Sequence, residues 1–149
     1  MAYGELGPTH HSIEDIAWLR AIDNMTIVVP ADPVETAAAM RWAAATDGPA
    51  FIRVSRMSVP QVYPDDYTFR PGRAVTLRDG GDITLMSDGT VLWRALVAAE
   101  QLGTEGIEAR VISSNLPPSP RQRLDNIGHL TQLPDIVTRP WERHPEALG

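Results

Sequence analysis

The sequence predicts an α/β protein with two partial parallel sheets and an irregular C-terminal tail. Residues 26–55 and residues 83–113 each hold a β-branched run, a helix-forming stretch and a second β-branched run. Such a strand–helix–strand unit normally gives two parallel strands with a right-handed crossover. Proline and glycine recur between the two units, as is typical of a linker. We therefore divide the chain into four segments: 1–57, 58–81, 82–114 and 115–149.

A short helix should open the first unit. Ser12 can cap this helix, and Asp15 stands three residues later, which is the spacing of a capping box. The apolar residues that follow recur at helical spacing as far as Leu19. Thr26–Val29 is a β-branched run that predicts a buried strand, and Pro30 ends it.

A longer, alanine-rich helix should follow from Pro33 to Thr46. Asp32 precedes it as a cap, proline suits its first turn, and Glu35 completes a D-x-x-E capping box. The strand Ala50–Ser55 closes the unit. We expect the packing face of this helix to consist of Ala37, Met40 and Ala44.

The second unit repeats this order after the linker. We expect strands near Ala74–Leu77, at Ile83–Ser87 and at Glu108–Ser113, and a helix at Val91–Leu102 that ends at Gly103 or Gly106. The apolar stripe of that helix comprises Leu92, Ala95, Leu96 and Ala99. Residues 115–149 are rich in proline and arginine and hold too little apolar area to offset the entropy of ordering them.

Composition excludes several classes of function. The 149 residues carry a net charge of −6, which argues against a protein that neutralises nucleic-acid phosphate. No apolar run approaches the length of about 20 residues that crosses a bilayer. Cysteine and lysine are absent, so thiolate sites and Schiff-base chemistry are excluded. The first residues lack the pattern of a signal peptide, and we expect a cytoplasmic protein.

Two histidines, His10 and His11, stand just before the first expected helix. Backbone N–H groups at a helix start attract anions, so a protonated imidazole there could hold a phosphate or polarise a carbonyl. Alternatively, both are ordinary loop residues that pack on the cap. A metal site with Glu14 and Asp15 is the third option, which adjacent histidines disfavour, and we predict no metal site.

Arg56 is the second candidate for binding. It ends the run Arg53-Val54-Ser55-Arg56 at the carboxyl end of an expected strand, where open parallel sheets bind their ligands. A guanidinium suits a bidentate contact to phosphate or carboxylate, although a surface arginine at a strand end fits the pattern equally well. Two weaker groups are interpreted structurally: Asp88-Gly89-Thr90 as an ordinary turn, and Trp18, Trp42 and Trp93 as core or interface residues.

These motifs resemble the transketolase family, in particular the C-terminal section of transketolases that are split between two polypeptides. The resemblance is carried by Gly7-Pro8-Thr9-His10-His11-Ser12-Ile13-Glu14-Asp15, Leu19-Arg20, Asn24-Met25, Pro30-Ala31-Asp32, Glu35, Gly48-Pro49 and Ile52-Arg53-Val54-Ser55-Arg56. It is specific over residues 7–56, which resemble the second half of the pyrimidine-binding domain. It is looser over residues 72–113, which resemble the start of the C-terminal domain.

The resemblance implies a thiamine-diphosphate enzyme that transfers a two-carbon ketol unit between sugar phosphates. The family's motif histidine, which lines the substrate channel, maps onto His10 as a catalytic and substrate-binding residue, and the arginine that binds substrate phosphate maps onto Arg56. The resemblance also implies a partner, an N-terminal transketolase subunit that carries the diphosphate site and Mg²⁺. A homo- or hetero-oligomer is the expected context.

The chain also departs from the family pattern. Leu6 replaces an acid that binds substrate hydroxyls, and Asp23 replaces a proline. The glutamate that activates the aminopyrimidine ring belongs upstream of the matched motif, so we expect it outside this chain and expect the isolated chain to be inactive. Two alternatives stay open: a non-catalytic remnant or interaction fragment, and a subunit similar to deoxyxylulose-phosphate synthases.

Overall fold

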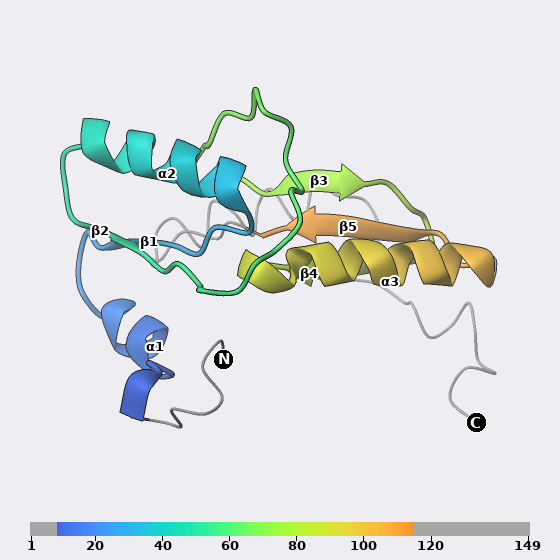
Figure 1. Cartoon of the computed structure of the whole chain (residues 1–149), viewed down its shortest axis with the longest axis horizontal. Coiled ribbons are helices and arrows are strands. Elements are labelled where there is room, and N and C mark those ends of the chain that lie inside the picture. The colour runs from blue at the N-terminus through green and yellow to red at the C-terminus, as the bar shows by residue number, and fades with distance from the viewer. Residues whose placement is uncertain (1–8, 115–149) are drawn as a thin grey trace.

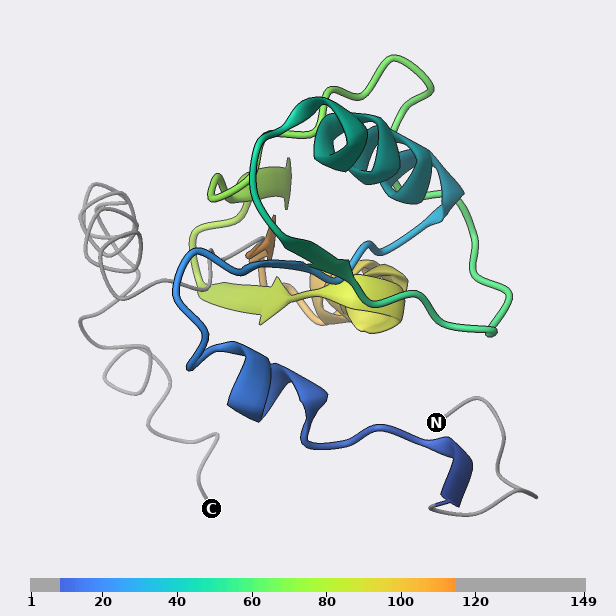
Figure 2. The ribbon, with the colours of Figure 1, turned by 90° about the vertical axis from the view of Figure 1, so that its left-hand side faces the viewer.

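The first unit is a parallel pair of strands joined by a helix, as the sequence predicts. The computed structural model describes residues 9–114, and the tail interpreted as irregular lies outside them. Strand β1 (Thr26–Val28) pairs in parallel with β2 (Ala50–Ile52), and helix α2 (Pro33–Ala45) connects them. Helix α1 (Asp15–Leu19) lies on the opposite side of this pair from α2 (Figures 1 and 2).

The second unit is a mixed three-stranded sheet with the order β3-β5-β4. Strands β4 (Ile83–Ser87) and β5 (Ala109–Ser113) are parallel and are joined by helix α3 (Leu92–Thr104). Strand β3 (Val75–Arg78) confirms the strand expected near 74–77 and pairs antiparallel with β5. The two strand–helix–strand units confirm the predicted α/β class.

Helix α1 starts three residues later than the predicted cap. Glu14 occupies the N-cap position and makes no side-chain cap bond, so the expected cap at Ser12 is wrong. The reason is a competing contact, because the Asp15 carboxylate pairs with Arg53 and the Arg53 guanidinium also binds the Ser12 carbonyl. Of these groups, the Asp15 carboxylate is the one that a capping box would turn back to the Ser12 N–H.

Helix α2 has the predicted cap but packs with a different face. The Asp32 carboxylate accepts from the Glu35 N–H at 2.7 Å, and the Glu35 carboxylate accepts from the Ala31 N–H at 2.8 Å. The cap buries Glu35 and turns Ala38 and Ala39 inward. The predicted packing face is therefore wrong, since its members are exposed: Ala37, Met40 and Ala44.

The stripe predicted for α3 does face the core. Leu92 and Ala99 are fully buried, and Ala95 and Leu96 pack against the same cluster. The helix continues through Gly103, and Gly106 turns the chain beyond it with a φ of +82°. The Asp88 side chain does not cap the turn before α3 but accepts hydrogen bonds from Ser114.

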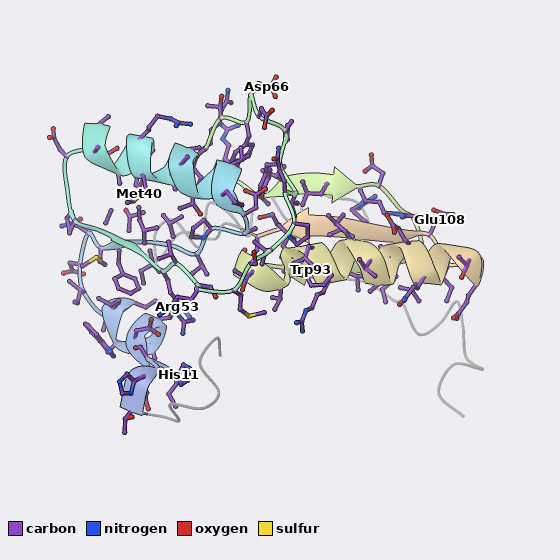
Figure 3. The ribbon with its side chains drawn as sticks, in the orientation of Figure 1. His11, Met40, Arg53, Asp66, Trp93 and Glu108 are labelled. Atoms are coloured by element: carbon purple, nitrogen blue, oxygen red, sulfur yellow. The ribbon has the colours of Figure 1, made fainter. Side chains whose placement is uncertain are left out.

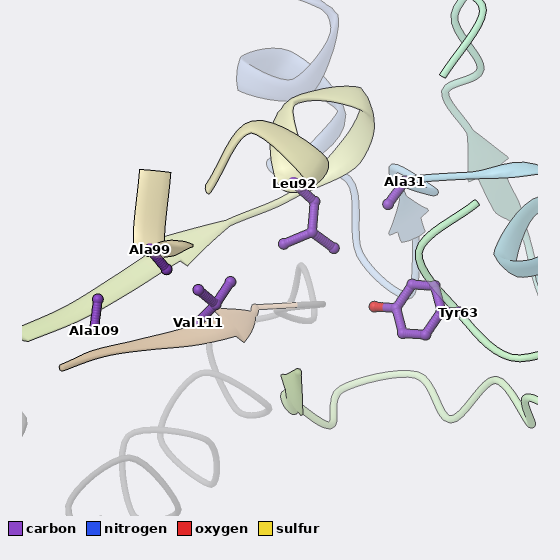
Figure 4. Packing of buried hydrophobic residues seen from close by; sticks show 6 residues of the cluster. All are labelled: Ala31, Tyr63, Leu92, Ala99, Ala109 and Val111. Carbon is purple, nitrogen blue, oxygen red and sulfur yellow. The ribbon is translucent and has the colours of Figure 1, made fainter. Parts of the chain in front are cut away.

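One hydrophobic cluster joins the two units. Ala31 comes from the first unit, Tyr63 from the segment between the units, and the remaining buried members from the second unit: Leu92, Ala99, Ala109 and Val111 (Figure 4). Tyr63 is only 1% exposed and stacks on Tyr67 with ring centroids 4.1 Å apart. The stretch between the units therefore contributes to the core.

Candidate functional site

A surface pocket of about 530 Å³ lies where the chain leaves three strands. Its walls come from the residues after β1, the first turn of α2, the residues after β2, and Thr90 after β4. The lining residues are Pro30, Ala31, Asp32, Pro33, Thr36, Ala37, Val54, Ser55, Arg56, Met57, Ser58, Val59 and Thr90. The carboxyl ends of strands are the usual place for ligands in open α/β sheets.

Arg56 lines this pocket, beyond the carboxyl end of β2. The Arg53 N–H donates to the Val28 carbonyl at 2.8 Å, so the chain stays in register with β1 one residue beyond β2. The chain then leaves the sheet, and the Met57 N–H donates to Ser55 Oγ at 3.1 Å. This local turn places Ser55 and Arg56 at the wall of the pocket, where both are exposed.

The first turn of α2 forms part of the pocket wall, but most of its hydrogen-bond donors are already bonded within the chain. Pro33 has no N–H, the Glu35 N–H binds the Asp32 carboxylate, and the Thr36 N–H and hydroxyl both bind the Asp32 carbonyl. The dipole of a helix attracts anions chiefly through such orphan N–H groups. Among the residues that line the pocket, Arg56 is the one with a positively charged side chain.

Thr90 is a pocket residue that the sequence interpretation missed. Gly89 has a φ of +60°, and a Cβ there would lie 2.8 Å from Val29 Cγ1. This close approach brings the turn after β4 against the end of β1 and places Thr90 at the pocket wall. The sequence signal was present, because Asp88-Gly89-Thr90 follows a strand, but nothing in the pattern indicated which element it would meet.

The two histidines lie apart from this pocket. His10 is exposed, with its Nδ1 2.9 Å from Thr9 Oγ1, and His11 is half-buried near α1 (Figure 3). Neither is among the lining residues, so this pocket contains Arg56 but not His10. With only five residues, α1 also carries few aligned peptide dipoles to attract an anion.

Arg53 connects the histidine segment to the strand that leads to Arg56. Its Nε lies 3.0 Å from Asp15 Oδ2, and its Nη2 donates to the Ser12 carbonyl at 2.7 Å. Asp15 is 5% exposed, and its Oδ1 has no hydrogen-bond partner among residues 9–114. The sequence pattern placed Arg53 on a strand face without a partner; only the fold shows what it contacts.

A buried polar cluster lies beside the pocket. The Tyr67 hydroxyl is 3.4 Å from Glu35 Oε1, and Tyr63 lies next to it with its hydroxyl enclosed. Burial, and then the negative charge of Glu35, raise the pKa of Tyr63 far above its usual 10, while the Ser113 side chain opposes the shift. Tyr63 therefore stays neutral across the ordinary pH range.

Neither a metal centre nor a membrane span is found in the described part of the chain. Residues 9–114 contain no group of three or more His, Asp or Glu side chains arranged to hold a metal ion. Within the same range, each helix is too short or too polar to span a bilayer.

Comparison with known families gives two adjacent matches. The pyrimidine-binding domain of transketolase matches residues 1–61, and the C-terminal domain of transketolase matches residues 72–117. Arg56 and His10 both fall in the first match, and Thr90 falls in the second. The pocket is thus lined by residues from both matched regions.

Individual relatives agree with these matches. The chain is 42% identical over 120 residues to an apulose-4-phosphate transketolase subunit of Phocaeicola vulgatus, covering 79% of this chain and 38% of that protein. It is 40% identical to the 1-deoxy-D-xylulose-5-phosphate synthase of Desulfotalea psychrophila, over 74% of this chain and 18% of that protein.

The fold of this chain is also similar to that of a solved structure. A split-gene transketolase, described as an inactive β4 tetramer, aligns with a TM-score of 0.68 and 43% identity, over 71% of this chain and 35% of that one. The chain therefore spans little more than a third of these subunit-sized relatives. The matched domains, the identities and the shared fold establish that the chain belongs to the transketolase family.

Proposed function

We propose that this chain is the substrate-binding part of a transketolase that is split between two polypeptides. It would belong to the polypeptide that carries the C-terminal section. It would transfer a two-carbon ketol unit between sugar phosphates together with an N-terminal transketolase subunit. The observation that carries the proposal is Arg56, a guanidinium at the wall of a pocket outside the carboxyl ends of β1 and β2. A bidentate charged contact to a sugar phosphate suits that position.

The described residues do not fit the diphosphate and metal part of the cofactor. The first turn of α2 is already capped by its own residues, and no metal-holding cluster occurs in residues 9–114. We therefore place thiamine diphosphate and Mg²⁺ on the N-terminal partner. Thiamine diphosphate, when bound, supplies the carbanion that carries the two-carbon unit.

This chain's own residues would bind and orient the substrate. Arg56 holds the phosphate and so fixes how far the ketose enters the channel, because binding the non-reacting end aligns the reacting carbonyl. His10 would contact sugar hydroxyls or the carbonyl from the N-terminal segment. Because His10 does not line the pocket that holds Arg56, assembly with a partner would bring the two into one channel.

Substitution of Arg56 tests the phosphate-binding role. The chain is mixed with an N-terminal transketolase subunit, thiamine diphosphate and Mg²⁺, and ketol transfer from a ketose phosphate to an aldose phosphate is measured. Arg56→Met should raise KM for the phosphorylated substrates by about 10- to 100-fold, since a charged hydrogen bond contributes about 1.5–3 kcal/mol. His10→Ala should lower kcat/KM with a smaller effect on phosphate affinity.

Arg41→Met provides the matched control. Arg41 is exposed on α2 and lies outside the pocket lining, so its substitution should leave KM unchanged. Equal kinetic effects of the two substitutions would remove Arg56 from the proposal. Absence of ketol transfer with every N-terminal partner tried would favour a non-catalytic remnant.

The likeness to a deoxyxylulose-phosphate synthase supports a second candidate reaction. Its identity of 40% is close to the 42% shared with the apulose-4-phosphate transketolase, so identity alone does not separate the two activities. To separate them, the ketose phosphate in the mixture is replaced by pyruvate, the aldose phosphate is glyceraldehyde 3-phosphate, and formation of 1-deoxy-D-xylulose 5-phosphate and CO2 is measured. Formation of that product without ketol transfer would replace the first proposal by the second.

A further inference from the structure

The Arg53 guanidinium bridges two segments that lie far apart in the sequence. Its backbone is fixed by the Val28 carbonyl at 2.8 Å, and its side chain reaches Asp15 at 3.0 Å and the Ser12 carbonyl at 2.7 Å. Figure 3 shows Arg53 beside α1, at the end of the molecule opposite Glu108. One side chain thus ties the residues after His11 to the strand exit that carries Arg56.

Helix α1 itself offers this segment no fixed start. The helix has five residues, and its N-cap residue Glu14 makes no side-chain cap bond. The contacts of Arg53 are directional, because Nε and Nη2 of one planar fork bind two different acceptors. The fork therefore imposes a defined direction on the contact between the start of α1 and the residue after β2.

Stability alone does not account for the pair. Asp15 is almost fully buried, yet its Oδ1 has no hydrogen-bond partner among residues 9–114. A buried carboxylate with an unpaired oxygen is costly, and its partner, the Arg53 side chain, is 38% exposed, so solvent weakens the attraction between the two charges. What an apolar pair could not reproduce is the fixed direction of the contact with the Ser12 carbonyl.

We propose that Arg53 is a positioning residue that sets the segment holding His10 and His11 relative to Arg56. The inference rests on the proposed ketol transfer, in which both groups act on one substrate. Arg53 itself would touch neither substrate nor cofactor. Loss of the fork would leave the fold intact but let the histidine segment move, and small misplacements of reacting groups reduce rates strongly.

The test is the double variant Asp15→Leu/Arg53→Met in the full chain. Amide hydrogen exchange over residues 9–14 should speed up about tenfold or more, while exchange in β1 and β2 stays unchanged. In the complex with the N-terminal partner, kcat/KM for ketol transfer should fall about 10- to 100-fold. The midpoint of thermal unfolding should remain close to that of the unsubstituted chain, because a partly exposed ion pair contributes little to stability and the costly burial of the Asp15 carboxylate is removed with it.

Arg110→Met is the matched control for a lost arginine ion pair. Arg110 Nε lies 4.0 Å from Asp79 Oδ1 in the second unit, and its loss should affect neither the exchange of residues 9–14 nor the kinetics. If the double variant fails to fold, Arg53→Lys replaces it. Lysine keeps the charge but not the planar fork, so the same two readouts should shift in the same direction by a smaller factor.

The outcomes separate this inference from the proposed function. Unchanged exchange of residues 9–14 in a folded variant overturns the positioning role, whether or not ketol transfer is observed. Faster exchange with unchanged kcat/KM in an active complex also overturns it, since the tether would then be structural only. If the unsubstituted complex transfers no ketol unit, the proposed function fails, and with it the catalytic part of this inference.

Discussion

At the scale of single residues, the adjacent glycines Gly80 and Gly81 differ in whether a larger residue could replace them. A Cβ on Gly80 would lie 2.4 Å from the Ala109 carbonyl carbon and 2.5 Å from the Arg110 nitrogen, both of them backbone atoms of the start of β5. A Cβ on Gly81 would meet nothing within 4 Å. The Gly-Gly pair looks uniform in the sequence, and only the neighbouring backbone distinguishes its members.

Gly80→Ala should therefore lower the free energy of unfolding by about 3 kcal/mol, because backbone of a paired strand cannot move aside cheaply. Gly81→Ala is the control and should change it by no more than about 0.5 kcal/mol. Urea denaturation of both variants measures the difference. Equal midpoints for the two would show that β5 gives way, contrary to the packing described.

Tyr63 makes stability depend on alkaline pH. Its pKa in the folded chain is raised above the usual 10, first by burial and then by the charge of Glu35, so the unfolded chain releases this proton more readily. Stability from this group is complete below pH 10 and declines as the pH rises further. Above pH 10 the free energy of unfolding should fall by up to about 1.4 kcal/mol per pH unit more than in Tyr63→Phe.

Denaturation at pH 9, 10 and 11 measures this slope. Tyr63→Phe keeps the ring in the core and removes the ionisable group, so it isolates the contribution of the hydroxyl. Identical slopes for Tyr63→Phe and the unsubstituted chain would mean that the phenol is solvated in the folded state.

At the scale of elements, Asp32 connects α2 to the segment that follows β2. Its Oδ1 caps α2 through the Glu35 N–H, and its Oδ2 accepts from the N–H groups of Val62 and Tyr63 at 2.7 and 2.8 Å. The capping box was predictable because its partners are three residues apart. The contacts with Val62 and Tyr63 were not, because they join positions about 30 residues apart in the sequence.

Removal of this carboxylate should affect more than one helix end. Asp32→Ala leaves three N–H groups without their acceptor, and we expect a loss of about 3 kcal/mol in the free energy of unfolding. Asp47→Ala, at an exposed position after α2, is the control and should be nearly neutral. Hydrogen exchange of the Val62 and Tyr63 amides should rise only in the first variant.

Sequence patterns predicted the presence of helices and strands better than they predicted which helix face is buried or where a helix begins. Strand β1 and helix α3 were recognisable because their residues carry strong periodic or β-branched signals. The face of α2 was not, because alanine surrounds the helix and the buried Glu35, a charged residue, points inward. The start of α1 was mispredicted because the partner of Asp15 comes from the end of β2, far along the chain.

At the scale of the whole molecule, apolar side chains lie exposed around α1. Ile13 is 66% exposed, Trp18 58% and Ile22 45%. Trp18 therefore does not belong to the core of this chain, and its predicted place at an interface stays a prediction. Neighbouring large apolar side chains in water favour association.

We expect the purified chain alone to self-associate. Sedimentation velocity should show species that grow with concentration, and the thermal transition should be broad. Trp18→Ser should shift the distribution towards monomer, whereas Trp42→Ser, which removes a half-buried ring packed on Phe69, should not. A monomer with a sharp, cooperative transition would contradict this expectation.

The candidate site was predictable only in part. Arg56 was a candidate because ligands bind at the carboxyl ends of parallel strands, and that rule applies without knowing which other residues lie nearby. The pocket around it was not predictable, because Thr90 reaches it only through the close approach of Gly89 to Val29 across the two units. The relation of His10 to Arg56 depends on the orientation of a segment that Arg53 fixes, and no local pattern encodes that orientation.

Tyr63 lies between the two strand–helix–strand units in the sequence and packs in the cluster that joins them. This has a consequence for gene division and for engineering. A gene cut between the two strand–helix–strand units would separate Tyr63 from either Ala31 or Val111, all of which meet in one cluster. One half would then have a cavity where the Tyr63 ring packs, and the other would expose that ring to solvent. We therefore expect that neither half folds stably on its own. The bend around Asp66 is exposed (Figure 3), but it joins the stacked rings of Tyr63 and Tyr67, so opening the chain there should loosen the same cluster.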